Sequence, residues 1–596
     1  MGPLASATVA PRLPIAVLLA LVLSPPIAAQ ETPQVRIDSI DSIFREFEGT
    51  RTPGCAVGVS EAHSIILERA YGMADLEHDV VNTAETVFEP GSVSKQFTAA
   101  ATILLALDGE ISLDDDVRKY IPELPDYGQT VTIRHLLNHT SGLRDWGSVA
   151  AIEGWPRTTR VHTHTHVLDI ASRQMSLNYP PGEYYSYTNT GYNLQAILVE
   201  RVTGISFADF SKERIFGPLG MTKTEWRDDF TRIVKARSIA YRRDREGRWS
   251  MLMPFENVHG NGGLLTTVGD LLRFTHNLDT GELGGPRFIE EMHRQGVLNS
   301  GRTIAYASGL FVGEYKGVRE VQHSGATAAY QGFLTRFPDQ GVAVAVMCNT
   351  SSGNSAGFAH SVADLFLGEA ITEPAVPEPP TAVDMPPEGL AALAGGYRIT
   401  DGTRLGTLFT VVAGEDRLRA AGTELFPVGA NRFRSARGTV LQFDDSPAAE
   451  GRPAVTLNPE SDPVRMEPVA SFDPTEAELV EYTGTYRSDE AEATFTMVVE
   501  NGELMLTDRW GEAGRLVPLY PDAFQAGGAT VIFRRDASGR ITEATVSESR
   551  VWDLRFRKKQ GGGTKREEGE EAKPPERGML GALEASGGLP SWPTHS

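Results

Sequence analysis

The stretch FEPGSVSKQF, residues 88–97, decides the fold of the first half of the chain and raises its main chemical question. Pro90 and Gly91 end an extended segment, and the apolar residues that follow recur at helical spacing. Ser92 is therefore predicted at a helix N-terminus, with Lys95 one turn later on the same side. Backbone N–H groups there stabilise a developing anion, and a desolvated lysine can serve as a base. The alternative is a capping serine followed by a surface lysine.

The length and charge of the chain restrict the possible classes of protein. A chain of 596 residues is too long for one hydrophobic core, which predicts two or more domains. The formal net charge of −22 gives an acidic surface that repels phosphate, which argues against nucleic acid as a partner.

The first thirty residues have the layout of a secretory signal peptide. Arg12 precedes the apolar run IAVLLALVL, and the helix-breaking SPP and then IAAQ follow it. Residues 1–29 are predicted to be cleaved, so the mature protein is expected to be exported to the periplasm or the medium, without stable membrane insertion. The alternative is an uncleaved N-terminal anchor, although the run is short for a bilayer span.

A proline-rich segment divides the chain. Residues 371–389 include EPAVPEPPTAVDMPPEG, which has no apolar period and predicts a stiff linker. Residues 34–370 before it mix helix and strand and form the predicted first domain. Residues 390–558 after it are β-rich, and residues 559–596 are predicted to be disordered because they are rich in glycine, glutamate and proline.

The β-rich part contains an internal repeat. LAALAGGYR at 390–398 is echoed by LVEYTGTYR at 479–487, and alternating strand-like runs follow each copy. Two halves of about four strands each are predicted to close into one small barrel, which removes exposed strand edges.

Two further stretches of the first domain carry polar groups suited to catalysis. Tyr187 and Asn189 lie in a loop rich in glycine and proline before an amphipathic helix, where one can relay a proton and the other can orient an amide. The alternative is a capping loop with a packed tyrosine. In VQHSGATAAYQGFLTRFPD, His323, Gly325 and Ala326 end a predicted strand whose small residues let the backbone approach a ligand and donate to an oxyanion.

In this order, the three elements resemble the serine β-lactamase and penicillin-recognising superfamily, above all its class C-like branch with the related esterases and D-aminopeptidases. IRHLLNHTSGL at 133–143 and GNGGLLTTVGDLLRF at 260–274 fit the same resemblance. It covers about residues 35–370 and implies an α/β (α+β) fold, an antiparallel sheet flanked by helices with a helical subdomain. The C-terminal part resembles the lipocalin-like barrel that follows such domains in some of these hydrolases.

The resemblance implies a role for each residue singled out. By this resemblance, Ser92 is the acylated nucleophile, and Lys95 and Tyr187 share the general-base and general-acid work. Asn189 contacts the substrate amide or Lys95. His323 and Gly325 mark the strand beside the site, and the backbone N–H groups of Ser92 and Ala326 form the oxyanion hole. No metal or organic cofactor is implied.

One position departs from the family pattern. The lactamase signature has lysine where this chain has His323. A fixed cation there suits the carboxylate of a β-lactam, whereas histidine is mostly neutral near pH 7. The departure predicts weaker recognition of penicillins and a shift toward esters or peptides, including those with D-residues.

Two groups of histidines outside these motifs have spacings that could suit metal ligands or bases. His162, His164 and His166 alternate and could share one face of a strand, but Thr165 is the predicted N-cap of a helix that ends such a strand. His135 and His139 have helical i, i+4 spacing and are interpreted as structural, because no acid or cysteine completes a site.

Two cysteines, Cys55 and Cys348, lie in apolar strand-like runs. They could be separate buried thiols or a pair. The resemblance implies that the first and last strands of the sheet are neighbours, which makes a cross-strand disulfide possible.

The sequence as a whole predicts an exported serine hydrolase that cleaves a peptide, amide or ester through an acyl-enzyme. A β-lactamase or penicillin-binding protein, and a non-catalytic peptidoglycan- or ligand-binding protein, are the alternatives. A small peptide, amide or ester is the expected partner, and homo-oligomerisation stays open.

Overall fold

The computed structural model describes residues 33–157, 159–372, 377–511 and 513–559. The predicted signal peptide and all but the first residue of the predicted tail lie outside the described residues. Within the described ranges, none of the helices combines the length and the apolar character that crossing a bilayer requires.

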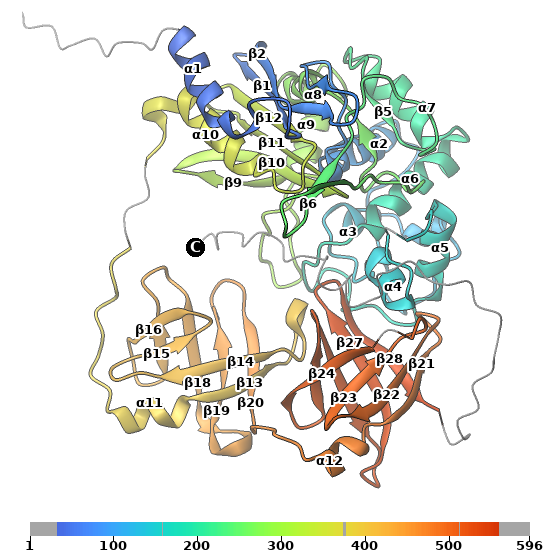
Figure 1. The fold of residues 1–596 in the computed structure, drawn as a ribbon. Coiled ribbons are helices and arrows are strands. Elements are labelled where there is room, and N and C mark those ends of the chain that lie inside the picture. Colours follow the sequence, from blue (N-terminus) through green and yellow to red (C-terminus); the bar gives the residue numbers. More distant parts are fainter. Residues whose placement is uncertain (1–32, 158, 373–376, 512, 560–596) are drawn as a thin grey trace, which may run out of the picture.

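A six-stranded antiparallel sheet forms the centre of the first domain, in the order β2-β1-β12-β11-β10-β9 (Figure 1). The strands are β1 (Cys55–Glu61), β2 (Ser64–Tyr71), β9 (Phe311–Tyr315), β10 (Val318–Thr327), β11 (Tyr330–Phe337) and β12 (Val342–Cys348). The first strand thus lies beside the last, as the family resemblance implied.

Helices cover both faces of this sheet, which explains why its central strands are continuous apolar runs. On one face, α1 (Pro33–Ile43) and α10 (Ser355–Leu367) pack on Val57 and Val59 of β1. On the other, α2 (Lys95–Leu107) and α8 (Val268–Thr280) share a core with Ala56. Alternate residues of one strand therefore belong to two separate cores.

The helical subdomain lies below the sheet in Figure 1. Its helices are α3 (Ile133–Leu137), α4 (Trp146–Glu153), α5 (His164–Arg173) and α6 (Thr190–Thr203), with α7 (Phe207–Ser211) and α9 (Gly285–His293) nearby in the same domain. Together with the sheet, this arrangement confirms the predicted fold class of the first domain.

A disulfide joins Cys55 to Cys348. The two cysteines are direct partners in the antiparallel register of β1 and β12, with Cα atoms 4.0 Å apart. Of the two alternatives left open by the sequence, the structure has the paired one.

The prediction of one C-terminal barrel is wrong, because each repeat closes into a complete eight-stranded barrel of its own. The first contains β13 (Gly395–Ile399), β14 (Leu408–Ala413), β15 (Leu418–Ala420), β16 (Thr423–Pro427), β17 (Arg432–Arg434), β18 (Val440–Pro447), β19 (Pro453–Leu457) and β20 (Val464–Val469). The second contains β21 (Gly484–Ser488), β22 (Ala493–Glu500), β23 (Glu503–Thr507), β24 (Ala513–Tyr520), β25 (Ala523–Ala526), β26 (Ala529–Arg535), β27 (Ile541–Glu548) and β28 (Val551–Lys558). Strands of three residues, such as β15 and β17, are too short to show an alternating pattern.

The repeat itself has a clear structural counterpart. Each barrel follows a short helix, α11 (Pro387–Leu393) or α12 (Glu476–Val480). Tyr397 and Tyr486, the tyrosines of the repeated motif, are fully buried, and each hydroxyl donates to the carbonyl four residues earlier, at 2.7 and 2.9 Å. The repeated letters therefore mark the start of two barrels rather than two halves of one.

The second barrel packs on the helical subdomain (Figure 1). Trp146 and Val149 of α4 and Val167 of α5 belong to the same apolar cluster as the interior of this barrel. Arg144 also donates to the carbonyl of Trp552 on β28 at 3.0 Å. These contacts hold the second barrel next to the loop that leads into α4, although the two are far apart in the sequence.

Candidate active site

Ser92 and Lys95 lie where the sequence predicts them, at the start of α2. Ser92 belongs to a short 3-10 turn, Gly91–Ser94, that continues directly into the helix, and its side chain is partly exposed. Lys95 is fully buried. Its Nζ donates to Ser92 Oγ at 3.1 Å, to Asn189 Oδ1 at 2.9 Å and to the carbonyl of Asn261 at 2.7 Å.

The surroundings of Lys95 favour its neutral form. Burial holds the pKa of the ammonium well below its usual value, and the positive charge of Arg550 lowers it further, against the opposing charge of Asp145. A neutral amine beside a partly exposed hydroxyl can accept its proton. The alternative of a surface lysine is excluded by the burial of Lys95.

Tyr187 lies across the site from Lys95, whose Nζ is 4.8 Å from the centre of the tyrosine ring. Burial raises the pKa of Tyr187, and interaction with the Ser92 side chain lowers it. The hydroxyl has no hydrogen-bond partner of good geometry among the described residues. Tyr187 is thus protonated at neutral pH and has a hydrogen bond to offer a reacting group.

Asn189 connects Lys95 to the helical subdomain. Its side-chain oxygen accepts from Lys95, and its backbone N–H donates to Asp145 Oδ2 at 2.7 Å. Asp145 is also the N-cap of α4, where it accepts from Ser148 N at 3.2 Å. The amide is therefore held from both sides, which fixes its oxygen toward the lysine.

The backbone of β10 passes directly over the turn that holds Ser92. A Cβ built on Gly325 would lie 2.5 Å from Ser92 N and 2.0 Å from the carbonyl oxygen of Pro90. A Cβ on Gly91, which has φ +54°, would lie 2.5 Å from Ala326 N. Only glycine fits at either position, and the absence of both side chains lets the strand approach the serine.

His323 lies on β10 at the same end of the site and is 2 % exposed. Its Nε2 lies 3.0 Å from the Tyr306 hydroxyl. Burial lowers the pKa of His323 to about 3, and the charge of Lys95 contributes to the shift. The position that is a fixed cation in the lactamase signature is accordingly a neutral imidazole here.

The histidines at 135 and 139 are structural, as interpreted from the sequence. His135 completes a capping box with Thr132 at the start of α3. His139 is fully buried, accepts from Thr188 N at 3.2 Å, and packs against the Tyr187 ring at 4.2 Å between centroids. It therefore supports the loop that presents Tyr187 and Asn189.

The turn between β27 and β28 brings one side chain of the second barrel into the site. The guanidinium of Arg550 lies 5.0 Å from the centre of the Tyr187 ring and 3.8 Å from Asp145 Oδ2. The backbone carbonyl of Arg550 accepts from Asp145 N at 3.3 Å and from Asn178 Nδ2 at 3.2 Å. This turn is therefore anchored to the loop that precedes α4.

A pocket of about 210 Å³ lies beside the end of β10 that carries Ala326. Its lining is formed by Arg157, Met253, Pro254, Phe255, Glu256, Ala326, Thr327 and Ala328. Arg157 and Glu256 form an ion pair, so their charges largely compensate one another. The remaining wall is mostly apolar and suits a small side chain or acyl group.

The alternating histidines do not act as one group. The predicted N-cap Thr165 is wrong: α5 begins at His164, and Thr163 caps it. The early start places His164 on the first turn of the helix. His162 instead contacts the carbonyl of Trp155 at 3.1 Å, and His166 contacts the Thr163 hydroxyl at 2.9 Å.

Three residues that hold the site together are not among those that the sequence motifs single out. Asp145 carried a local signal, since an aspartate before an apolar run is a typical N-cap. Tyr306 and Arg550 carried none, because each reaches the site only through the packing of distant segments.

In this site a buried lysine donates to a partly exposed serine, and a tyrosine and a glycine-containing strand lie beside them. This arrangement is typical of serine hydrolases with the penicillin-recognising fold. Residues 40–369, more than half of the chain, match the family described as Beta-lactamase. The chain belongs to this family of serine hydrolases.

Curated relatives extend the match beyond the first domain. Penicillin-binding protein 4* of Bacillus subtilis is 27 % identical over 415 residues, which are 65 % of this chain and 88 % of the relative. A D-aminopeptidase of Brucella anthropi is 28 % identical over 515 residues, 83 % of this chain and 93 % of the relative. The octameric penicillin-binding protein homologue from Pyrococcus abyssi shares the fold, with a TM-score of 0.50 and 23 % identity over 79 % of this chain and 96 % of that one.

Proposed function

We propose that the protein hydrolyses an amide, peptide or ester bond through an acyl-enzyme on Ser92. The observation that carries the proposal is the contact of 3.1 Å between Ser92 Oγ and a fully buried Lys95, whose pKa is held low. The neutral amine takes the serine proton as Oγ attacks the substrate carbonyl. The tetrahedral oxyanion then lies between the backbone N–H groups of Ser92 and Ala326.

The second half of the reaction returns the proton. The leaving nitrogen or oxygen receives it from Lys95, with Tyr187 in the relay, and the carbon–heteroatom bond breaks to leave an ester on Ser92. Water then attacks this ester and gives up its proton to the same pair, which passes it to Ser92 Oγ as the bond between Oγ and the acyl carbon breaks and the acid is released. Asn189 keeps Lys95 in place throughout, because its oxygen accepts from the lysine.

The substrate class is an amide whose acyl group carries no carboxylate, with D-aminoacyl amides as the first candidates. The D-aminopeptidase of Brucella anthropi, which aligns over 93 % of its length, supports this choice. The neutral His323 supports it as well, because no fixed cation at that position holds the carboxylate of a β-lactam. The pocket beside Ala326 is large enough for a small side chain.

Export is part of the same proposal. The layout of residues 1–29 is that of a cleaved signal, and the disulfide between Cys55 and Cys348 fits an oxidising compartment. We propose the periplasm or the medium as the place of action.

The first experiment is labelling with a fluorophosphonate probe, followed by intact-mass measurement. We expect one adduct on the wild type and none on Ser92→Ala. The control is Ser324→Ala, which removes a different, partly exposed serine on β10 and should leave the adduct unchanged. An adduct that persists in folded Ser92→Ala refutes the assignment of the nucleophile. No adduct on the wild type favours a non-catalytic binding protein instead.

A further inference from the structure

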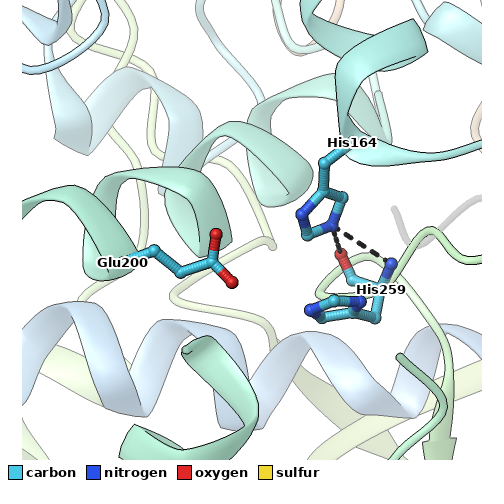
Figure 2. Close-up of side chains that lie close together, drawn as sticks. All are labelled: His164, Glu200 and His259. Atoms are coloured by element: carbon cyan, nitrogen blue, oxygen red, sulfur yellow. Dashed lines mark hydrogen bonds between the residues drawn. The ribbon is translucent and has the colours of Figure 1, made fainter. Parts of the chain in front are cut away.

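A second group of polar side chains lies outside the catalytic machinery. It consists of His164 at the start of α5, Glu200 near the end of α6, and His259 in the loop between β7 (Trp249–Met251) and β8 (Leu264–Leu265). One potential ligand atom from each residue lies within 4.8 Å of the other two. Figure 2 shows the glutamate side chain reaching toward the two rings.

Packing alone does not explain why a histidine occupies position 259 of this group. The residue is 7 % exposed, and neither of its ring nitrogens has a hydrogen-bond partner among the described residues. Its ring packs against His164 at 4.2 Å and Phe207 at 5.8 Å between centroids. Apolar side chains could fill the same space, whereas a buried imidazole without partners loses the hydrogen bonds it has in water.

His164 is already oriented like a metal ligand. Its Nε2 lies 3.0 Å from the carbonyl oxygen of His259 and 3.3 Å from the backbone nitrogen of the same residue, and Figure 2 draws both contacts as dashed lines. When Nε2 donates to the carbonyl, the shorter of the two contacts, Nδ1 carries the free electron pair. A ligating histidine typically donates its other N–H to a carbonyl or carboxylate in this way, which fixes both the tautomer and the ring.

Glu200 supplies the negative charge. One carboxylate oxygen, Oε1, accepts from Phe207 N at 3.1 Å, which holds the group at the end of α6. The side chains of Glu200 and His164 are partly exposed, so water can reach the site.

We propose that His164, Glu200 and His259 bind one divalent transition-metal ion, with Zn²⁺ as the ion of matching ligand chemistry. Two imidazoles and a carboxylate are common zinc ligands, and water fills the fourth position of such a site. With bonds of about 2.0–2.2 Å, tetrahedral ligands lie about 3.4 Å apart. The three side chains close around the ion by a shift of about an ångström, which the long arm of Glu200 accommodates.

The site is linked to the active site through the loop that carries His259. Asn193 Nδ2 donates both to the carbonyl of His259 at 2.7 Å and to Asn261 Oδ1 at 2.8 Å. The carbonyl of Asn261 in turn accepts from Lys95. An ion at this position therefore stabilises the loop that holds the catalytic lysine, without touching the reacting atoms.

The test uses the purified chain after treatment with a chelator, and Zn²⁺ alone as the probe. We expect one Zn²⁺ per chain by elemental analysis, and a visible absorption spectrum of tetrahedral intensity when Co²⁺ replaces it. Glu200→Gln and His164→Ala should each weaken Zn²⁺ binding in calorimetry by at least about a hundredfold, the upper end of the loss when an outer-shell partner is removed.

The control is His78→Ala, in the more exposed cluster of Asp75, Glu77 and His78 that could also offer three ligands. This variant should bind Zn²⁺ as the wild type does. Both test variants change partly exposed side chains, and circular dichroism verifies that they fold. Absence of stoichiometric binding overturns the proposal, and so does binding that survives both substitutions or is lost with His78. None of these outcomes depends on catalysis, so they leave the role of Ser92 to its own test.

Discussion

At the scale of single residues, the proposed chemistry depends on Lys95, which is fully buried and contacts no acidic side chain among the described residues. Its hydrogen bonds go to a hydroxyl, an amide oxygen and a carbonyl, none of which carries a formal charge. A buried ammonium with only neutral partners is costly, which is why the neutral amine is favoured. A carboxylate at the position of Asn189 would stabilise the ammonium and weaken the base.

Replacing Lys95 should therefore remove the general base and leave the nucleophile in place. We expect Lys95→Ala to lower kcat/KM for an activated ester by about 10²–10⁴-fold, the usual contribution of a positioned acid–base group. Because the amine acts when neutral, wild-type activity should fall as the pH drops through the pKa of Lys95. A Lys95→Ala enzyme with the rate and pH profile of the wild type would contradict this role.

His323 allows a sharper test of the departure from the lactamase pattern. With a pKa of about 3, it stays neutral across the range in which enzymes are usually assayed. We expect His323→Gln to keep the pH profile of kcat/KM between about pH 5 and pH 8, where an ordinary histidine would titrate. Loss of a limb of the profile in this variant would show that His323 ionises during turnover.

The same neutrality predicts slow turnover of β-lactams. Hydrolysis of a chromogenic cephalosporin by the wild type should be much slower than hydrolysis of a D-aminoacyl anilide, in parallel assays at pH 7. Efficient cephalosporin hydrolysis would overturn the proposed substrate class.

At the scale of elements, no local sequence pattern predicts that the turn between β27 and β28 reaches the candidate active site. The sequence predicted the helix at Ser92, the loop at Tyr187 and the strand at His323, because each has a period or a turn signal of its own. Arg550 lies in a two-residue turn like many others. Its contact with Tyr187 exists only because a barrel packs on α4, which is a property of the assembled molecule.

Removal of the guanidinium should shift the pH dependence of catalysis. Arg550 lowers the pKa of Lys95, so in Arg550→Ala that pKa rises and a larger fraction of the lysine is protonated at neutral pH. The acidic limb of kcat/KM should move to higher pH, and Arg550→Lys should restore much of the wild-type profile.

The matched control for this prediction is Arg540→Ala, in the turn that precedes β27. Arg540 is 80 % exposed and pairs with Asp536 of its own turn. Its loss should leave the profile unchanged. An Arg550→Ala profile that coincides with the wild type would show that the charge has no effect on the lysine.

At the scale of the whole molecule, the sequence identified the fold of the first domain but not the number of barrels. The fold of the first domain could be predicted from the sequence because its central strands are long apolar runs and because three motifs occur in a recognisable order. The barrels have strands as short as three residues, so the repeat was visible while the closure of each copy was not. Barrel closure depends on pairing between the first and last strands, such as β13 with β20, which has no signal in a local window.

Buried neutral histidines should make the folded protein sensitive to acid. Burial lowers the pKa of His162 to about 4, of His293 to about 4 and of His323 to about 3, below the ordinary value of 6.5. Between those values and 6.5 the unfolded chain binds more protons than the folded one, so stability is lost as the pH falls below about 6.5. Each such histidine contributes up to about 1.4 kcal/mol per pH unit.

Thermal unfolding followed by calorimetry from pH 7 down to pH 5 should thus show a falling Tm, and the His162→Gln variant should have a shallower dependence. A Tm that is constant or rises over this range would contradict the assignment of neutral histidines.

The anchoring of Arg550 also has a consequence in time. A ribosome extends the chain at about 5–20 residues per second, so the nucleophile and its lysine emerge long before the turn between β27 and β28. A nascent chain can close its central sheet, with Cys55 opposite Cys348, while Asp145 still lacks its cationic neighbour. From this order of synthesis we expect the second barrel to fold last, and its folding then brings the charge of Arg550 to the surroundings of Lys95.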